Sequence, residues 1–236
     1  MIYIGTSGYN YPEWKGSFYP ADLPAAKMLP YYAERFGTVE INYTFYRMPN
    51  AKLVDGWARQ TPDPFRLTLK APRRITHDRK LKETGDLVRG FCDVAATLGP
   101  RLGALLFQLP PTFKCDLAVF DDFLQTLPPK LTAAFEFRHA SWLQDDVYER
   151  LRQRNLALCI ADAADRSTPI VETADYGYLR LRDEGYEAAD IQRWADELRA
   201  RASTWKETFV YFKHEDEGKG ALFAQQLTDA LGSRQS

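Results

Sequence analysis

Short apolar segments of strand length recur along this chain, and a segment of helical character follows nearly every one of them. The strand candidates are stretches of three to seven residues: 3–5, 38–42, 66–70, 103–109, 133–137, 157–161, 176–181 and 208–212. Regular alternation of strands and helices predicts a parallel sheet with the helices packed outside it. Eight such units in 236 residues favour a closed (β/α)8 barrel of the TIM type over an open, doubly wound sheet.

The helical candidates show apolar residues that recur on one face. They cover seven segments: 29–36, 51–60, 86–98, 116–127, 145–154, 188–201 and 221–231. Asn50 is placed to cap the second of these helices, and Gly99-Pro100 ends the third. The connection 163–174 carries little helical signal, so we expect no regular helix there. No internal repeat or linker interrupts the pattern, and we expect a single barrel domain over residues 1–236.

Charge and cysteine content exclude several classes of protein. The formal net charge is -1, so no overall field attracts nucleic acid or an acidic membrane. No apolar stretch approaches the roughly 20 residues of a membrane span. Three widely spaced cysteines, without a CxxC motif, argue against a disulfide framework or a zinc finger. We therefore expect a cytoplasmic protein that does not associate with membranes.

Polar and charged residues gather at one end of the predicted strands. Each lies at or near the carboxyl end of its strand: Glu40, Asn42, Lys70, Gln108, Glu136, Arg138, Asp162, Arg180 and Lys213. The carboxyl ends of barrel strands form the rim where ligands bind. Interior ion pairs that only fill the barrel are the alternative interpretation. Because so many separate strands contribute, we expect a ligand site.

The cations of this rim predict a small anionic ligand. Arg138 and Arg180 offer guanidinium groups that can bind phosphate or carboxylate in a bidentate manner. Lys70 adds a point charge and belongs to the expected catalytic set. A substrate that carries a phosphate or a carboxylate is therefore the expectation.

The carboxylates of the rim predict acid–base chemistry. Glu136 and Glu40 are the candidates for general acid and base, since neighbouring charges can set the pKa of a carboxyl group. Asp162, Asn42 and Gln108 would orient them. We expect an enzyme of the hydrolase, lyase or isomerase type.

The sequence offers few side chains that could serve as metal ligands. The chain has three histidines, one in a basic loop and two just past strand ends, which is too few for a multi-zinc site. A single Mg²⁺ or Mn²⁺ held by Glu40, Glu136 and Asp162 stays open as an alternative. Otherwise no cofactor is expected.

Lys70 has two further interpretations. A lysine on a barrel strand can form a Schiff base with a carbonyl substrate when desolvation or nearby cations lower its pKa. The alternative is a structural ion pair with Glu40 or Glu136. The sequence favours the ion pair.

Two loops offer other binding surfaces. The loop 73–82 carries six basic side chains and could hold a nucleic-acid backbone, or it could be a solvated loop balanced by Asp78, Glu83 and Asp86. The loop after the first strand is rich in tyrosine, tryptophan and phenylalanine. It either seals the edge of the barrel or lines a ligand pocket. A nucleic-acid-binding or adaptor barrel without catalysis is therefore the alternative to an enzyme.

Several motifs, in this order, resemble the DUF72 family, also called YecE-like proteins. They are IGTSGYNYPEWKGSFYP, FGTVEINYTFYRMP, LKAPRRITH, LLFQLPPTF, FEFRHASW and YLRLRDEGY. The resemblance covers nearly the whole chain and implies a (β/α)8-type barrel. It implies no particular reaction, because the family is named for unknown function.

The resemblance also implies site residues beyond the charged rim. Motif positions of the family fall here on Tyr46, His77, Trp14 and Trp142, which we expect to contact the ligand. Two segments depart from the common pattern of the family: Leu181-Arg182-Asp183 and Lys213-His214-Glu215-Asp216. Both lie beside the predicted site.

Overall fold

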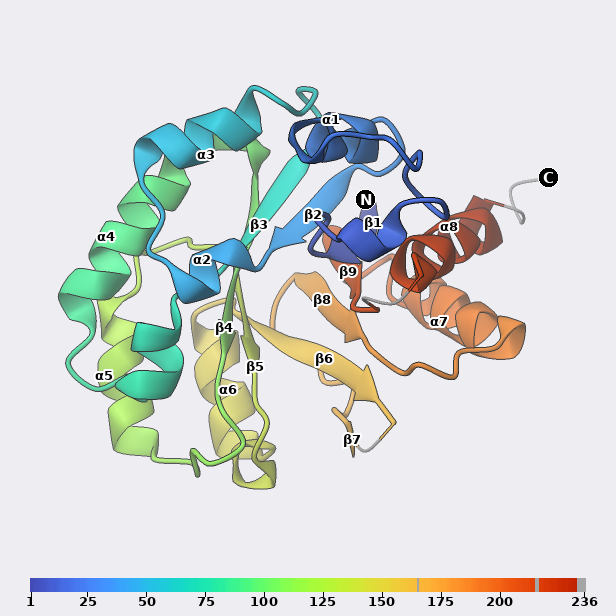
Figure 1. The fold of residues 1–236 in the computed structure, drawn as a ribbon. Coiled ribbons are helices and arrows are strands. Elements are labelled where there is room, and N and C mark those ends of the chain that lie inside the picture. The colour runs from blue at the N-terminus through green and yellow to red at the C-terminus, as the bar shows by residue number, and fades with distance from the viewer. Residues whose placement is uncertain (165, 215–216, 233–236) are drawn as a thin grey trace.

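All eight predicted strand segments form strands in the computed structural model, which describes residues 1–164, 166–214 and 217–232 (Figure 1). The parallel strands are β1 (Ile2–Ser7), β2 (Thr38–Ile41), β3 (Arg66–Lys70), β4 (Leu102–Gln108), β5 (Ala133–Glu136), β6 (Ala157–Ala163), β8 (Tyr176–Leu181) and β9 (Glu207–Phe212). Each one pairs in parallel with its neighbours, β1 pairs with β9, and β5 pairs with β6. The sheet therefore closes, and the predicted (β/α)8 barrel is confirmed.

A short antiparallel strand, β7 (Arg166–Ser167), extends the end of β6. The sequence gave no indication of it, because two residues are too few to show a pattern. From residue 168 to 175, the connection to β8 contains no helix. The expected loss of a regular helix at this point is confirmed for that segment.

The helices surround the strands (Figure 1). They are α1 (Met28–Ala33), α2 (Tyr43–Tyr46), α3 (Ala51–Ala58), α4 (Gly85–Ala96), α5 (Leu117–Thr126), α6 (Asp145–Gln153), α7 (Ala188–Ala200) and α8 (Lys219–Gly232). Asn50 caps α3 as expected, since its Oδ1 accepts a hydrogen bond from the Leu53 amide at 2.9 Å. The helix α2 has only one turn and was not predicted, because its four residues read as an aromatic loop.

Two separate cores follow from the alternation of side chains along each strand. Outward-facing residues such as Phe107, Phe135 and Leu179 pack against the helices. Inward-facing residues form a smaller core inside the barrel, consisting of Ala104, Leu106, Ala134, Ala157, Cys159, Tyr176, Tyr178, Phe209 and Tyr211. Small residues on β4, β5 and β6 leave space for the tyrosines of β8 and β9. The interior is therefore filled. Its carboxyl end holds the buried charges, while Arg66 and Glu207 face inward at the amino end, lie 3.7 Å apart and remain partly exposed.

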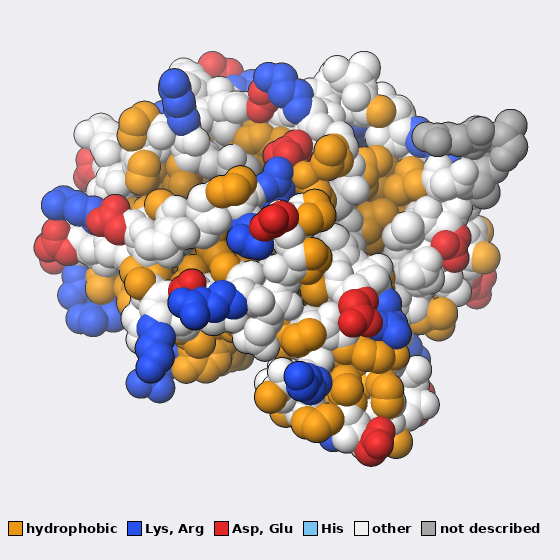
Figure 2. Space-filling view, turned by 90° about the horizontal axis from the view of Figure 1, so that it is seen from above, with side chains coloured by type: hydrophobic (Ala, Val, Ile, Leu, Met, Phe, Trp, Pro, Cys, Tyr) orange, Lys and Arg blue, Asp and Glu red, His pale blue; other side chains and the backbone are white. Residues whose placement is uncertain are grey.

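The exterior agrees with the small net charge. Figure 2 shows one face on which basic and acidic side chains are interspersed, with hydrophobic side chains between them. Among the described residues, no helix is long and apolar enough to cross a membrane.

Candidate functional site

Three buried charges occupy the carboxyl end of the barrel interior. Along β2, Val39 and Ile41 face outward, so Glu40 points into the barrel. Glu136 on β5 and Arg180 on β8 point inward in the same way. One amino group of Arg180, Nη2, lies 2.8 Å from Oε1 of Glu40, and Nη1 lies 2.5 Å from Oε2 of Glu136. All three side chains are at most 2 % exposed, so the guanidinium joins two buried carboxylates.

Neighbouring strands supply the remaining partners of Glu40. Its Oε1 accepts a hydrogen bond from Ser7 Oγ, and its Oε2 accepts one from the Tyr178 hydroxyl, both at 2.5 Å. Asn42 donates through Nδ2 to Ser7 Oγ at 2.9 Å. These bonds continue the network from the interior to the rim.

Glu136 is held equally firmly. Gln108 Nε2 donates to its Oε2 at 2.7 Å, and Arg138 Nε donates to its Oε1 at 2.8 Å. Arg182 Nη1 lies 4.0 Å from the same Oε1. Buried carboxylates need this degree of pairing, because an unpaired charge in the interior is very costly.

Both carboxyl groups have lowered pKa values. Burial by itself raises the pKa of each, but the charge of Arg180 outweighs burial at Glu40 with help from Ser7. At Glu136, Arg180 and Arg138 together hold the pKa well below its usual range. Glu40 and Glu136 therefore stay ionised at neutral pH, and their oxygens are occupied by donors.

Lys70 differs from the other charges of the network. It ends β3, its residue is 8 % exposed, and its Nζ lies 4.2 Å from the centre of the Phe45 ring on α2. Within the described chain, no carboxylate lies at salt-bridge distance from this ammonium, so the expected direct ion pair with Glu40 or Glu136 is not formed. Burial and the charge of Arg180 lower the pKa of Lys70 to about 7, against the opposing effect of the two glutamates.

His77 also contacts the Phe45 ring. It belongs to a five-residue π-helix, Arg74–Asp78, and its ring centre is 4.9 Å from that of Phe45. Its Nδ1 is 2.9 Å from Thr76 Oγ1. Burial and the charge of Lys70 lower the pKa of His77 to about 4, so the imidazole is neutral at pH 7.

The structure does not bring Asp162 to this cluster. Ala161 is the partner of Arg180 in the register between β6 and β8, so Ala161 faces inward and Asp162 outward. The carboxylate accepts hydrogen bonds from the hydroxyl of Tyr186 at 2.8 Å and from Trp194 Nε1 at 3.2 Å. Asp162 thus ties β6 to α7 on the outer side of the barrel.

Three predicted ligand contacts also lie apart from the cluster. Trp14 is fully buried and packs against Tyr11, with 4.9 Å between ring centres. Trp142 is fully buried as well and donates through Nε1 to the carbonyl of Phe113 at 2.8 Å. Tyr46 is 76 % exposed and touches Phe45 edge to face. Core packing places both tryptophans, since their large rings fill the outer core.

The ligands predicted for a single Mg²⁺ or Mn²⁺ are not assembled. Arg180 stands between Glu40 and Glu136, and Asp162 faces the opposite side of its strand. No group of three or more His, Cys, Asp or Glu side chains suited to a metal ion occurs in the described ranges.

Sequence reasoning missed Tyr178 and Arg182 as members of the site. Tyr178 stands two residues before Arg180 on the same strand, so period-two alternation could have placed it on the inward face. Arg182 follows two residues after Arg180. In the second departing segment, the charge of Lys213 helps to lower the pKa of Lys70, whereas His214 packs against Phe212 and Phe223. Glu215 and Asp216 lie outside the described residues.

The basic loop 73–82 is folded rather than extended. Arg73 pairs with Asp78 at 3.1 Å, and Arg79 donates to the carbonyl of Glu83 at 2.7 Å. Ile75 and Leu81 are buried. Part of its positive charge is therefore already engaged within the loop.

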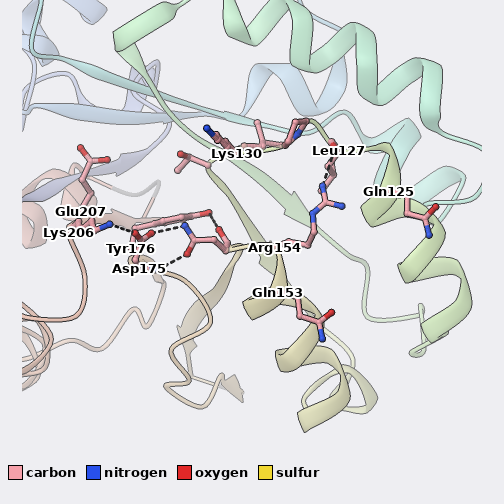
Figure 3. Close-up of a pocket in the computed structure, with 13 residues that line it drawn as sticks. Gln125, Leu127, Lys130, Gln153, Arg154, Asp175, Tyr176, Lys206 and Glu207 are labelled. Carbon is pink, nitrogen blue, oxygen red and sulfur yellow. Dashed lines mark hydrogen bonds and ion pairs between the residues drawn. The ribbon is translucent and has the colours of Figure 1, made fainter.

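Two cavities lie near opposite ends of the barrel. One of about 250 Å³ adjoins the site at Asn42. Another of about 760 Å³ opens at the amino ends of the strands, between Lys130, Arg154 and Asp175 (Figure 3). The smaller one thus belongs to the end that carries the buried charges.

Comparison with known proteins agrees with the fold. The family model for DUF72, a protein family of unknown function, matches residues 3–236. The UPF0759 protein YecE of Escherichia coli K12 is 34% identical over 157 residues, which is 66% of this chain and 55% of YecE. The match thus spans about half the length of YecE. The UPF0759 protein YunF of Bacillus subtilis is 23% identical over 270 residues, covering 98% of this chain and 95% of YunF.

Solved structures agree with the barrel fold. A DUF72 family protein from Thermotoga maritima superposes with a TM-score of 0.89 at 27% identity, covering 98% of this chain and 99% of its own. One from Enterococcus faecalis has a TM-score of 0.82 at 20% identity, covering 98% and 96%, and supports the fold alone. On the extent of the family match and the shared barrel, this chain belongs to the DUF72 family.

Proposed function

We propose that this protein is an enzyme that binds a small anionic substrate at the carboxyl end of the barrel and transfers a proton through Lys70. The observation that carries the proposal is the state of that lysine. It is buried, it lies outside salt-bridge distance of the described carboxylates, and its pKa is about 7. Perturbed groups of this kind concentrate at functional sites.

An excess of positive charge supports the anionic substrate. Within the described ranges, four cationic side chains lie near the two glutamates: Lys70, Arg138, Arg180 and Arg182. Burial and the charge of Arg180 lower the pKa of Arg182. An anion placed among these groups relieves their mutual repulsion. A phosphate or a carboxylate fits their geometry best.

The glutamates take a different part in this proposal from the one expected of them. A general acid at neutral pH needs a pKa near 7, and both carboxyl groups lie far below it. Glu40 and Glu136 instead fix Arg180 and Arg138 in place. Gln108 donates to Glu136, and Asn42 donates to Ser7, which in turn donates to Glu40. Acid–base work passes to Lys70, whose pKa of about 7 suits it to donate or accept a proton near neutral pH.

The lowered pKa of Lys70 also favours a second mode of catalysis. A neutral lysine amine can attack a substrate carbonyl, so that a C–N bond forms and water leaves as the Schiff base appears. Trapping with borohydride and small keto acids distinguishes the two modes. A reduced adduct on Lys70 supports the Schiff base, and its absence leaves proton transfer.

A titration of individual lysines tests the proposal. With ¹³C-labelled lysine and NMR detection, we expect Lys70 to titrate near pH 7. Added inorganic phosphate should raise its pKa, because a bound anion favours the ammonium form. Lys206 is the internal control, since its exposed ion pair with Asp175 raises its pKa. A Lys70 pKa near 10 that does not respond to phosphate would refute the proposal.

The nucleic-acid alternative has its own test. Binding of labelled DNA or RNA should fall steeply with salt and should be lost when Arg73, Arg74 and Arg79 are replaced by Gln. We favour the enzyme, because Arg73 and Arg79 are already engaged within the loop. Salt-sensitive binding that these changes abolish would reverse that preference.

A further inference from the structure

An aromatic cavity adjoins the proposed site on the side of β1 and β2. It has a volume of about 250 Å³. Three segments form it: the loop that follows β1, the end of β2 with the start of α2, and the helix α3. Its lining residues are Gly8, Tyr9, Asn10, Tyr11, Ile41, Asn42, Tyr43, Leu53 and Trp57. A cavity of about 150 Å³ suffices for benzene, so this one has room for a substituted ring.

Two chains of contacts link the cavity to the charged network. Asn42 borders the cavity and donates to Ser7, which in turn donates to Glu40. The helix α2 connects them a second time, because Tyr43 lines the cavity while Phe45 contacts the Lys70 ammonium. Asn42 and the helix α2 are therefore shared by the cavity and the charged network.

The chemistry of the walls selects an aromatic ring. Ile41, Leu53 and Trp57 offer apolar surface. Two of the three lining tyrosines have engaged hydroxyl groups, because Trp57 hydrogen-bonds Tyr9 and the Tyr11 hydroxyl donates to the Ser7 carbonyl at 2.7 Å. Polar side chains of the lining are limited to these tyrosines, Tyr43, Asn10 and Asn42, so most hydroxyl groups of a sugar would face apolar surface. A flat apolar ring suits them.

Exposed apolar side chains near Tyr43 also indicate a binding surface. Tyr43 is 47 % exposed, and Tyr46 and Met48 on the same connection are exposed too. Large apolar side chains are seldom left in water in a group, and such groups mark binding surfaces. Tyr43 also meets the Trp57 ring edge to face, with 6.3 Å between centres.

We propose that the substrate of the site is an aromatic anion, with its ring in the cavity and its phosphate or carboxylate among Lys70, Arg138 and Arg182. This inference rests on the proposed function, whose anion site it extends. Tyr43 would supply one face of the contact with the ring, and the Asn42 amide would lie between the ring and the anionic group.

Calorimetric titration with phenyl phosphate, inorganic phosphate and phenol tests the inference. We expect phenyl phosphate to bind at least 10-fold more tightly than inorganic phosphate. The variant Tyr43→Ala should weaken phenyl phosphate about 3- to 10-fold, the loss of one aromatic contact, and should leave inorganic phosphate unchanged. Leu222→Ala on α8 is the control for loss of an exposed apolar side chain, since Leu222 is 54 % exposed and does not line the cavity.

The outcomes separate this inference from the proposed function. Equal affinity for phosphate and phenyl phosphate, unaffected by Tyr43→Ala, would overturn the aromatic substrate and leave the anion site standing. Tighter binding of glucose 6-phosphate than of phenyl phosphate would also overturn it. Binding of phenol alone, sensitive to Tyr43→Ala, would refute the anion site while supporting the cavity. Failure of all three probes would overturn both.

Discussion

The two ends of the barrel carry similar charged residues in very different surroundings. At the carboxyl end, Arg180, Glu40 and Glu136 are at most 2 % exposed and form one hydrogen-bonded unit. At the amino end, Lys206 pairs with Asp175 at 2.6 Å, but both side chains remain in contact with water (Figure 3). At both ends a basic side chain pairs with a carboxylate, but the pair is buried at one end and exposed at the other.

Burial explains why the pKa shifts are larger at one end of the barrel than at the other. Water screens the exposed pair, so its coupling is weak, and the pKa of Asp175 is lowered mainly by its hydrogen bonds to Lys206 and Asn155. Inside the barrel, where the dielectric is low, burial and the charge of Arg180 lower the pKa of Lys70 to about 7. A cavity alone therefore does not identify the site, since the amino-terminal one is larger.

The largest expected effect comes from breaking the buried unit. Arg180→Met leaves Glu40 and Glu136 without their shared cation, and removal of one partner from a buried ion pair costs about 3–5 kcal/mol. Urea unfolding at pH 7 measures this loss. Arg182→Met is the matched control, because Arg182 lies 4.0 Å from Glu136 and is partly exposed. Equal losses in both variants would show that the buried unit has no special importance.

Lys70→Met should stabilise the protein at pH 7. The pKa of Lys70 is lowered in the folded state, so between about pH 7 and 10.5 the unfolded chain binds more protons. Wild-type stability should therefore rise with pH across this window, through this residue. The variant lacks that contribution and should gain roughly 4 kcal/mol at pH 7, since the pKa falls from 10.5 to about 7 and each pKa unit corresponds to about 1.4 kcal/mol.

Urea unfolding of both proteins from pH 7 to pH 10 measures the Lys70 contribution as a difference. Other residues titrate in this range, but they do so in both proteins and cancel. A gap between the two proteins that narrows as the pH rises supports the prediction. A gap that is constant with pH would contradict a lowered pKa at Lys70.

Tyr178→Phe should have a smaller effect. The change removes the hydroxyl that donates to Glu40 Oε2 and leaves the other partners of this carboxylate in place. Loss of a hydrogen bond to a buried charge costs about 1.5–3 kcal/mol. Tyr176→Phe on the same strand is a useful comparison, because its hydroxyl bonds only backbone groups. A larger loss at Tyr176 than at Tyr178 would be the contrary result.

The smallest effect is expected at the amino end. Asp175→Asn removes the exposed pair with Lys206, and we expect a slight loss of stability that disappears at high salt. Because the folded pKa of Asp175 is lowered, its contribution is present at neutral pH and is lost as the pH falls through that pKa. A loss as large as that of Arg180→Met would erase the distinction between the two ends.

The barrel could be predicted because its signal is repeated along the chain. Each strand candidate had the right length and polarity, and the register then brought Glu40, Lys70, Glu136 and Arg180 to one end as expected. One-turn helices and two-residue strands such as α2 and β7 fall below the length at which periodicity is visible.

The tasks of the individual site residues could not be predicted in the same way. Asp162 was assigned inward because it ends a strand, yet the register places Ala161 opposite Arg180 and turns Asp162 outward. The pairing of Lys70 depended on distances of a few ångströms between strands that are far apart in sequence. Alternation fixes the face of a strand only when its exact phase is known.

Arg180 joins three strands that share no backbone hydrogen bonds with one another, since β9 and β1 separate β8 from β2, and β6 separates β8 from β5. Its guanidinium therefore connects β2, β5 and β8 across the barrel interior through side-chain contacts alone. A related chain that loses this arginine should have replaced both glutamates as well, because the three positions can only change as a set.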